Sequence, residues 1–179
     1  MVLITVGGPP GSGTTTVCRL LQDRTGLDYV YAGKIFRDLA KERGISLERF
    51  SDICEEDESI DRNLDKRMLA RAIEGDVIIE GRMIGPLIKR ENIDGIKVYI
   101  KASLDIRAAR VMERDGGHLE KVKKNMAERE ESEMKRYIGY YGIDPSDEFY
   151  YDLVLDSSEM KPDEEVDLII AKMNERFDK

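Results

Sequence analysis

Leu3-Ile-Thr-Val-Gly-Gly-Pro-Pro-Gly-Ser-Gly-Thr-Thr-Thr16 is the stretch that decides the fold. It starts with a short apolar, β-branched run, passes through a turn of glycine and proline, and ends in three threonines before an amphipathic segment. This order predicts a strand, a glycine loop and a helix. Because glycine readily adopts positive φ, the loop can turn its N–H groups inward and form a concave site for phosphate oxygens at the helix N-terminus.

The spacing of the glycines fits a phosphate-binding pattern. Gly8 and Gly13 match the frame of the phosphate loop G-x-x-x-x-G-K-[ST], and Thr15 stands where a hydroxyl ligates Mg²⁺. Thr14 occupies the position of the lysine. An ordinary glycine-rich turn is the alternative, but the strand and helix on either side favour a phosphate loop.

The composition narrows the class of protein. A chain of 179 residues suits one domain, and its net charge of −8 argues against a general nucleic-acid or acidic-membrane surface. Cys18 and Cys54 show neither metal-ligand spacing nor a disulfide framework, so we expect both in the core. The sequence contains no signal-type segment and no run of membrane-spanning length. We expect a cytoplasmic monomer without nucleic-acid or membrane partners.

Short runs of β-forming residues recur along the chain, with helical patterns between them. Near-continuous apolar strands that alternate with helices predict a parallel sheet covered on both faces, which is a three-layer α/β fold. Ligands of such sheets bind beyond the carboxyl ends of the strands. The predicted strands are residues 3–6, 29–31, 77–80, 97–100 and 153–155.

Two connections are longer than a simple crossover requires. Between the second and third strands, three helical patterns indicate an inserted lobe. Between the fourth and fifth strands, two helices and a glycine turn are predicted, which indicates a lid. We expect a single domain with its core at 1–33, 77–113 and 137–179, the insertion at about 34–76 and the lid at about 114–128.

The helices of the second long connection carry aligned arginines. Side chains at i, i+3 or i+4, and i+7 share one face of a helix. In a chain of net charge −8, two such faces predict a lid that folds over phosphates, with salt-bridged surface helices as the alternative. The aligned residues are Arg107, Arg110 and Arg114 on the first helix, and Arg129, Glu133 and Arg136 on the second.

Other arginines follow other strands. Arg37 follows the second predicted strand and Arg82 follows the third. Arginine grips phosphate bidentately and stays charged, and phosphoryl transfer requires its developing charge to be neutralised while water is excluded. Because these arginines are far from the lid in sequence, the pattern predicts a second anionic substrate and not water as the acceptor.

Together these motifs resemble those of the nucleoside monophosphate kinases, and they are most similar to the cytidylate kinases of the archaeal type. The resemblance covers nearly the whole chain, and the order of the motifs is more specific than any one of them. It rests on the glycine loop, Ala32-Gly-Lys-Ile-Phe-Arg37, Glu80-Gly-Arg82, the lid arginines and Asp152-Leu-Val-Leu-Asp-Ser157.

The resemblance implies transfer of the γ-phosphoryl of ATP to CMP or dCMP, on a P-loop NTPase fold with sheet order 2-3-1-4-5. It implies that Arg82, Arg129 and Arg136 act in catalysis, and that Thr15 ligates Mg²⁺. It places the CMP at Gly33, Arg37, Arg82 and Glu133. It places the ATP phosphates at Gly8, Pro9, Pro10, Gly11, Ser12, Gly13, Thr14, Thr15, Thr16 and Arg110.

The chain departs from the family pattern at two positions. Met83 stands where bacterial cytidylate kinases have an aspartate that helps to read the base, so we expect Asp61, Arg62 or Asp65 to read it. The alternative is that Asp61 and Asp65, at i and i+4, form an exposed acidic face. Thr14 cannot supply the charge of a lysine. We expect Arg129, Arg136 or Arg110 to supply it instead.

Two other functions stay open at this point. One is a kinase for a different acceptor, such as AMP, UMP or shikimate. The other is a nucleotide sensor that lost catalysis together with the lysine. The intact arginine sets argue against the sensor.

Overall fold

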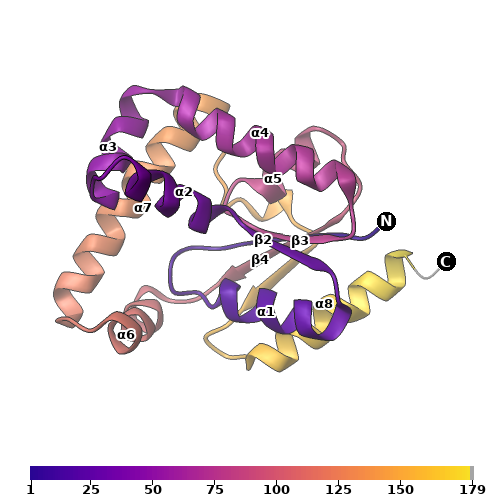
Figure 1. Ribbon diagram of the computed structural model, residues 1–179. Coiled ribbons are helices and arrows are strands. Elements are labelled where there is room, and N and C mark those ends of the chain that lie inside the picture. Colours follow the sequence, from indigo (N-terminus) through magenta and orange to yellow (C-terminus); the bar gives the residue numbers. More distant parts are fainter. Residues whose placement is uncertain (178–179) are drawn as a thin grey trace.

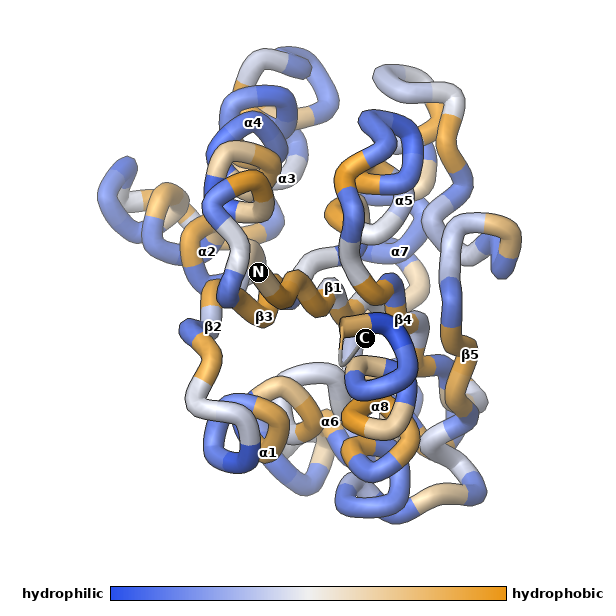
Figure 2. Tube along the Cα trace, turned by 90° about the vertical axis from the view of Figure 1, so that its right-hand side faces the viewer, coloured by the Kyte–Doolittle hydropathy of each residue, from blue (hydrophilic) through white to orange (hydrophobic). Residues whose placement is uncertain are grey.

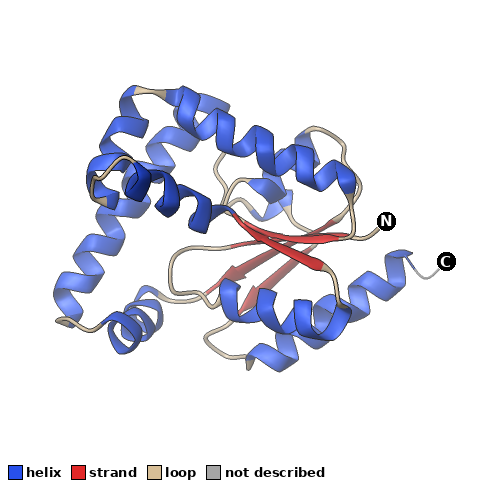
Figure 3. Cartoon of the chain, viewed as in Figure 1, coloured by secondary structure: helices blue, strands red, loops and turns tan. Residues whose placement is uncertain are grey.

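The computed structural model describes residues 1–177 and contains the predicted three-layer α/β fold. A five-stranded parallel sheet has the order β2-β3-β1-β4-β5, and helices cover both of its faces (Figures 1 and 3). Each predicted strand boundary lies within one residue of the observed one. The strands are β1 Leu3–Gly7, β2 Asp28–Tyr31, β3 Val77–Glu80, β4 Ile96–Lys101 and β5 Leu153–Asp156.

The strands are apolar almost throughout because both faces of the sheet are buried. Along β1, Leu3 packs with the side chains of α4 (Glu58–Glu74) and α5 (Ile84–Arg90), whereas Ile4 and Val6 pack with those of α1 (Thr14–Thr25) and α8 (Pro162–Phe177). Figure 2 shows the apolar β1 and β3 between these two helical layers. Cys18 is buried in the α1 layer, as predicted.

The first long connection contains three helices, as predicted: α2 (Ala32–Glu42), α3 (Leu47–Glu56) and α4. They enclose a small core of their own, built on Ala40, Phe50, Cys54 and Ile60. Asp57 begins α4 by accepting a hydrogen bond from the backbone N–H of Ser59 at 3.0 Å. A separate small core is consistent with an inserted lobe that folds semi-independently.

The second long connection contains α6 (Leu104–Asp115) and α7 (Leu119–Tyr141), joined by a turn with positive φ at Gly116 and Gly117. A short 3₁₀ helix, Glu148–Tyr150, precedes β5. The helix α7 runs without a break through residue 128, where the expected lid ends, and it packs against α3 (Figure 1). None of the helices within residues 1–177 is long and apolar enough to cross a membrane.

Candidate active site

A cavity of about 410 Å³ lies at the carboxyl ends of β1, β2 and β3, between the glycine loop and the helices α4, α6 and α7. Most of the predicted site residues line it, although they come from distant parts of the sequence. They are Gly8, Pro9, Pro10, Gly11, Gly13, Thr14, Thr15, Thr16, Gly33, Arg37, Asp61, Arg82, Arg110, Arg129, Glu133 and Arg136.

Two predicted site residues do not line the cavity. The side chain of Ser12 is fully buried beneath the loop, and its N–H donates to the carbonyl of Pro9. Arg62 is one residue beyond Asp61, which turns it about 100° around α4. It therefore points outward, where it pairs with Glu58 and donates to the carbonyl of Tyr140 at 3.0 Å. Arg62 therefore lies outside the cavity, in contrast to the expectation that it binds the substrate.

The glycine loop is held tightly against α6. Gly11 has φ +78°, and a Cβ at this position would lie 2.7 Å from the carbonyl oxygen of Arg107. Gly13, with φ +96°, precedes the first turn of α1, whose residues 14–16 line the cavity. Glycine is therefore needed at position 11 for both backbone conformation and space, and at position 13 for backbone conformation.

Replacing Gly11 with alanine is expected to abolish ATP binding and to lower stability more than the same change at Gly26. Both glycines have positive φ, +78° and +71°, which costs an alanine about 1–2 kcal/mol, but nothing lies within 4 Å of a Cβ at Gly26. Thermal melting with and without ATP measures both effects. Equal losses in the two variants would show that the approach of α6 does not constrain the loop.

Two arginines of α6 donate hydrogen bonds to carbonyl groups of the glycine loop. Arg107 donates to the carbonyl of Pro10 at 3.1 Å and pairs with Glu130 of α7 at 2.6 Å. Arg110 donates to the side chain of Ser157 at 2.9 Å and contacts loop carbonyls. The expectation of three aligned arginines that all face a ligand is therefore wrong for Arg107, because its buried guanidinium is occupied by the protein.

Glu80, at the end of β3, is a residue to which the sequence analysis gave no role. Its Oε1 accepts hydrogen bonds from Thr14 at 2.7 Å and Thr15 at 2.8 Å, and its Oε2 accepts one from Tyr29. The sequence signal for this role is the position of Glu80 at the carboxyl end of β3, the strand that pairs with β1. A hydroxyl and a carboxylate that converge beside a phosphate loop fit Mg²⁺, which prefers oxygen ligands and keeps several waters.

Two arginines share a single acid at the centre of the cavity. Arg82 pairs with Glu133, and Arg129 donates to the same carboxylate at 2.9 Å. Burial lowers the pKa of both guanidinium groups. That of Arg129 falls to about 10, and the positive charge of Arg82 also contributes to this decrease. One positive charge is left without a counter-charge in this group, so a bound anion is favoured here.

Arg37 approaches the same cavity from α2. Its guanidinium donates to the hydroxyl of Tyr31 at 3.2 Å and lies 4.9 Å from the centre of that ring. Gly33 lies between them in sequence and also lines the cavity. Arg37 from α2 and Arg82 from the turn after β3 therefore line the same cavity.

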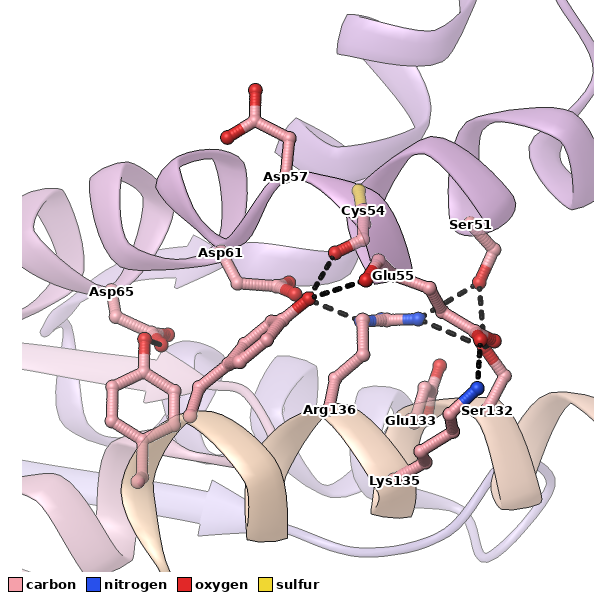
Figure 4. A network of polar contacts seen from close by, with 12 residues as sticks. Ser51, Cys54, Glu55, Asp57, Asp61, Asp65, Ser132, Glu133, Lys135 and Arg136 are labelled. Atoms are coloured by element: carbon pink, nitrogen blue, oxygen red, sulfur yellow. Dashed lines mark hydrogen bonds and ion pairs between the residues drawn. The ribbon is translucent and has the colours of Figure 1, made fainter.

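Arg136 is already paired inside the protein. Its Nε donates to Asp61 at 2.8 Å, its Nη1 donates to Ser51 and Ser132, and both charged side chains are less than 7% exposed (Figure 4). The alternative of an exposed acidic face at Asp61 is therefore wrong. This ion pair joins α4 to α7 at the cavity wall.

The sheet order, the glycine loop after β1 and the opposing arginines define a P-loop phosphotransferase. Comparison with known proteins identifies the family to which the chain belongs. The profile of the cytidylate kinase-like family matches residues 3–159, and the chain belongs to this family.

Relatives are similar over almost their full length. A cytidylate kinase of Methanopyrus kandleri is 46% identical over 97% of this chain and 93% of that protein. A cytidylate kinase of Pyrococcus abyssi is 42% identical over 99% of this chain and 97% of that protein. Shikimate kinase from Acinetobacter baumannii in complex with shikimate has a TM-score of 0.62 at 15% identity, over 100% of this chain and 96% of that one, a likeness in fold alone.

Proposed function

We propose that the protein transfers the γ-phosphoryl group of ATP to CMP or dCMP, giving ADP and CDP or dCDP. A phosphate oxygen of the acceptor attacks the γ-phosphorus while the bond to ADP breaks, so that no general base is needed. The observation that carries the proposal is the pair Arg82 and Arg129, which share only Glu133 and leave one cation for transferring phosphate. The relatives named cytidylate kinase support the acceptor.

On the donor side, the glycine loop and the first turn of α1 would hold the ATP phosphates. Thr15 and Glu80 are the residues that would hold Mg²⁺, Thr15 directly and Glu80 directly or through water. When bound, Mg²⁺ neutralises charge on the phosphates. Arg110 keeps the loop carbonyls and Ser157 in place beneath them.

On the acceptor side, Arg37 and Arg82 would grip the phosphate of CMP, with Gly33 beside it. The apolar side chains of Leu64, Met68 and Met83 line the same cavity and suit the flat faces of a base. The lobe of α2, α3 and α4 is then the monophosphate-binding insertion, and the turn between α6 and α7 is part of the lid.

The charge that Thr14 cannot supply would come from Arg129. Of the three arginines considered for this role, Arg136 is neutralised by Asp61, and Arg110 is bonded to the loop and to Ser157. Arg129 shares its acid with Arg82 and is only half-buried. Its guanidinium is therefore the best placed to follow the transferring phosphoryl group.

The proposal is tested by coupled detection of ADP with ATP and a panel of acceptors: CMP, dCMP, UMP, AMP and shikimate. We expect turnover with CMP and dCMP, and loss of turnover when EDTA removes Mg²⁺. Turnover with AMP or shikimate alone would assign a different acceptor. Binding of ATP without transfer to any acceptor in a single-turnover assay would assign a sensor.

Replacing Tyr29 with phenylalanine is expected to weaken the apparent affinity for Mg²⁺ by about tenfold. The hydroxyl of Tyr29 holds one oxygen of Glu80, and without it this carboxylate loses its fixed orientation. Titration of activity with Mg²⁺, and of Mn²⁺ binding to the ATP complex by electron paramagnetic resonance, measures the change. Tyr99→Phe is the control, because the Tyr99 hydroxyl has no hydrogen bond among residues 1–177. Unchanged metal affinity in Tyr29→Phe would remove Tyr29 from the site.

A further inference from the structure

One face of α4 forms a wall of the cavity. Asp61, Leu64, Asp65 and Met68 follow at i, i+3, i+4 and i+7, and all of them line the cavity. Two of these side chains are apolar and two are acidic. Such a wall suits a flat ring that has a hydrogen-bond donor on its edge.

The two acids differ in what already binds them. Asp61 is neutralised by the guanidinium of Arg136 at 2.8 Å. Asp65 has no cation bonded to it among residues 1–177, and its Oδ2 accepts a hydrogen bond from the hydroxyl of Tyr141 at 2.6 Å. In the same part of the chain, no donor is bonded to its Oδ1. Asp65 therefore has one oxygen held in place and one oxygen open to a ligand.

Tyr141 is itself fixed, which makes it a good support for Asp65. The guanidinium groups of Arg62 and Arg90 lie 5.2 and 5.6 Å from the centre of its ring. The ring also packs in a cluster with Met83 and Leu87. An anchored phenol that donates to one carboxylate oxygen directs the other oxygen of that carboxylate.

We propose that Asp65, oriented by Tyr141, selects the acceptor nucleotide by accepting a hydrogen bond from the amino group at C4 of cytosine. An ionised carboxylate can only accept hydrogen bonds. Cytosine has an amino donor at C4, whereas uracil has a carbonyl oxygen there, which would face the carboxylate unpaired. The inference rests on the proposed function and names the residue that makes this site prefer CMP over UMP.

The protonation state of Asp65 gives an independent readout. Burial raises the pKa of Asp65 to about 6; Asp61 adds to the shift, and Tyr141, Arg90 and Arg62 oppose it. Below that pKa, a protonated carboxyl can donate to the carbonyl oxygen of uracil. The preference for CMP is therefore expected to be strong above this pKa and to fall as the pH drops through it.

The test compares kcat/KM for CMP and for UMP in the wild type, Asp65→Asn and Tyr141→Phe. In Asp65→Asn we expect the ratio of the two to fall by at least about tenfold, because the hydrogen bond to CMP loses its charged acceptor and the amide can also donate to the carbonyl oxygen of uracil. Tyr141→Phe should lower the same ratio by a smaller factor. Glu74→Gln, an exposed change on the same helix, should leave it unchanged.

The outcomes separate the inference from the proposed function. A wild type without activity on CMP contradicts the proposed function. A wild type that phosphorylates CMP, with equal losses for CMP and UMP in Asp65→Asn, contradicts the inference and makes Asp65 structural. If Asp65→Asn does not fold, a ratio in Tyr141→Phe equal to that of the wild type overturns the proposal. A wild-type ratio that does not change through the pKa of Asp65 also counts against it.

Discussion

Replacing Arg129 with methionine is expected to lower kcat for phosphoryl transfer to CMP by on the order of 10³. Arg129 shares the carboxylate of Glu133 with Arg82, so that one of these two positive charges is not neutralised within the group. Because the two arginines share one acid, Arg129→Met should remove a charge from the site without disturbing the fold. When Arg129 is removed, Glu133 keeps Arg82 as its partner, so no buried acid is left unpaired and the fold should be preserved.

Steady-state and single-turnover kinetics measure the effect, and thermal melting checks the fold. Arg67→Met is a matched control because Arg67 is exposed on α4 and lies outside the cavity. A kcat within a few fold of the wild type for Arg129→Met would mean that another group supplies the charge of the missing lysine. Arg110 would then be the next candidate, in spite of its bonds to the loop.

The strands could be predicted because the signal for them is local. Each is a short apolar run whose two faces are both buried, and Ile78 and Ile79 show this on adjacent positions of β3. The order of the strands is different, because periodicity does not specify which strand lies beside β1. That order followed from the resemblance to nucleoside monophosphate kinases, and the structure confirms it.

The part of the site that is contiguous in sequence could be predicted. The part whose roles depend on contacts with side chains distant in sequence could be predicted less well. The glycine loop lies within a few residues, so its spacing is enough. The roles of the arginines depend on distant side chains, because the same residue type serves as a support in Arg107 and as a paired ion in Arg136. The role proposed for Glu80 as a Mg²⁺ ligand depends on its hydrogen bond to Thr15 of α1, which is distant in sequence.

The second large effect is expected for replacement of Arg136, and it is a loss of stability. Replacing Arg136 with methionine should lower the free energy of unfolding by about 3–5 kcal/mol, because it leaves Asp61 buried without its cation. Asp61→Asn with Arg136→Met should recover part of this loss, since no unpaired charge remains. Urea denaturation of the single and double variants measures the coupling between the two residues.

The pH dependence of the loss gives its cause. Burial raises the pKa of Asp61 and Arg136 lowers it, so that removing Arg136 raises this pKa further in the folded state. An acid whose pKa is higher in the folded than in the unfolded state reduces stability at high pH, and the penalty disappears as the pH falls through the folded pKa. The deficit of Arg136→Met should therefore be largest at neutral pH and shrink in acid. If the variant unfolds like the wild type while its kcat falls by on the order of 10³, Arg136 acts on the transferring phosphoryl group and its pairing with Asp61 breaks during the reaction.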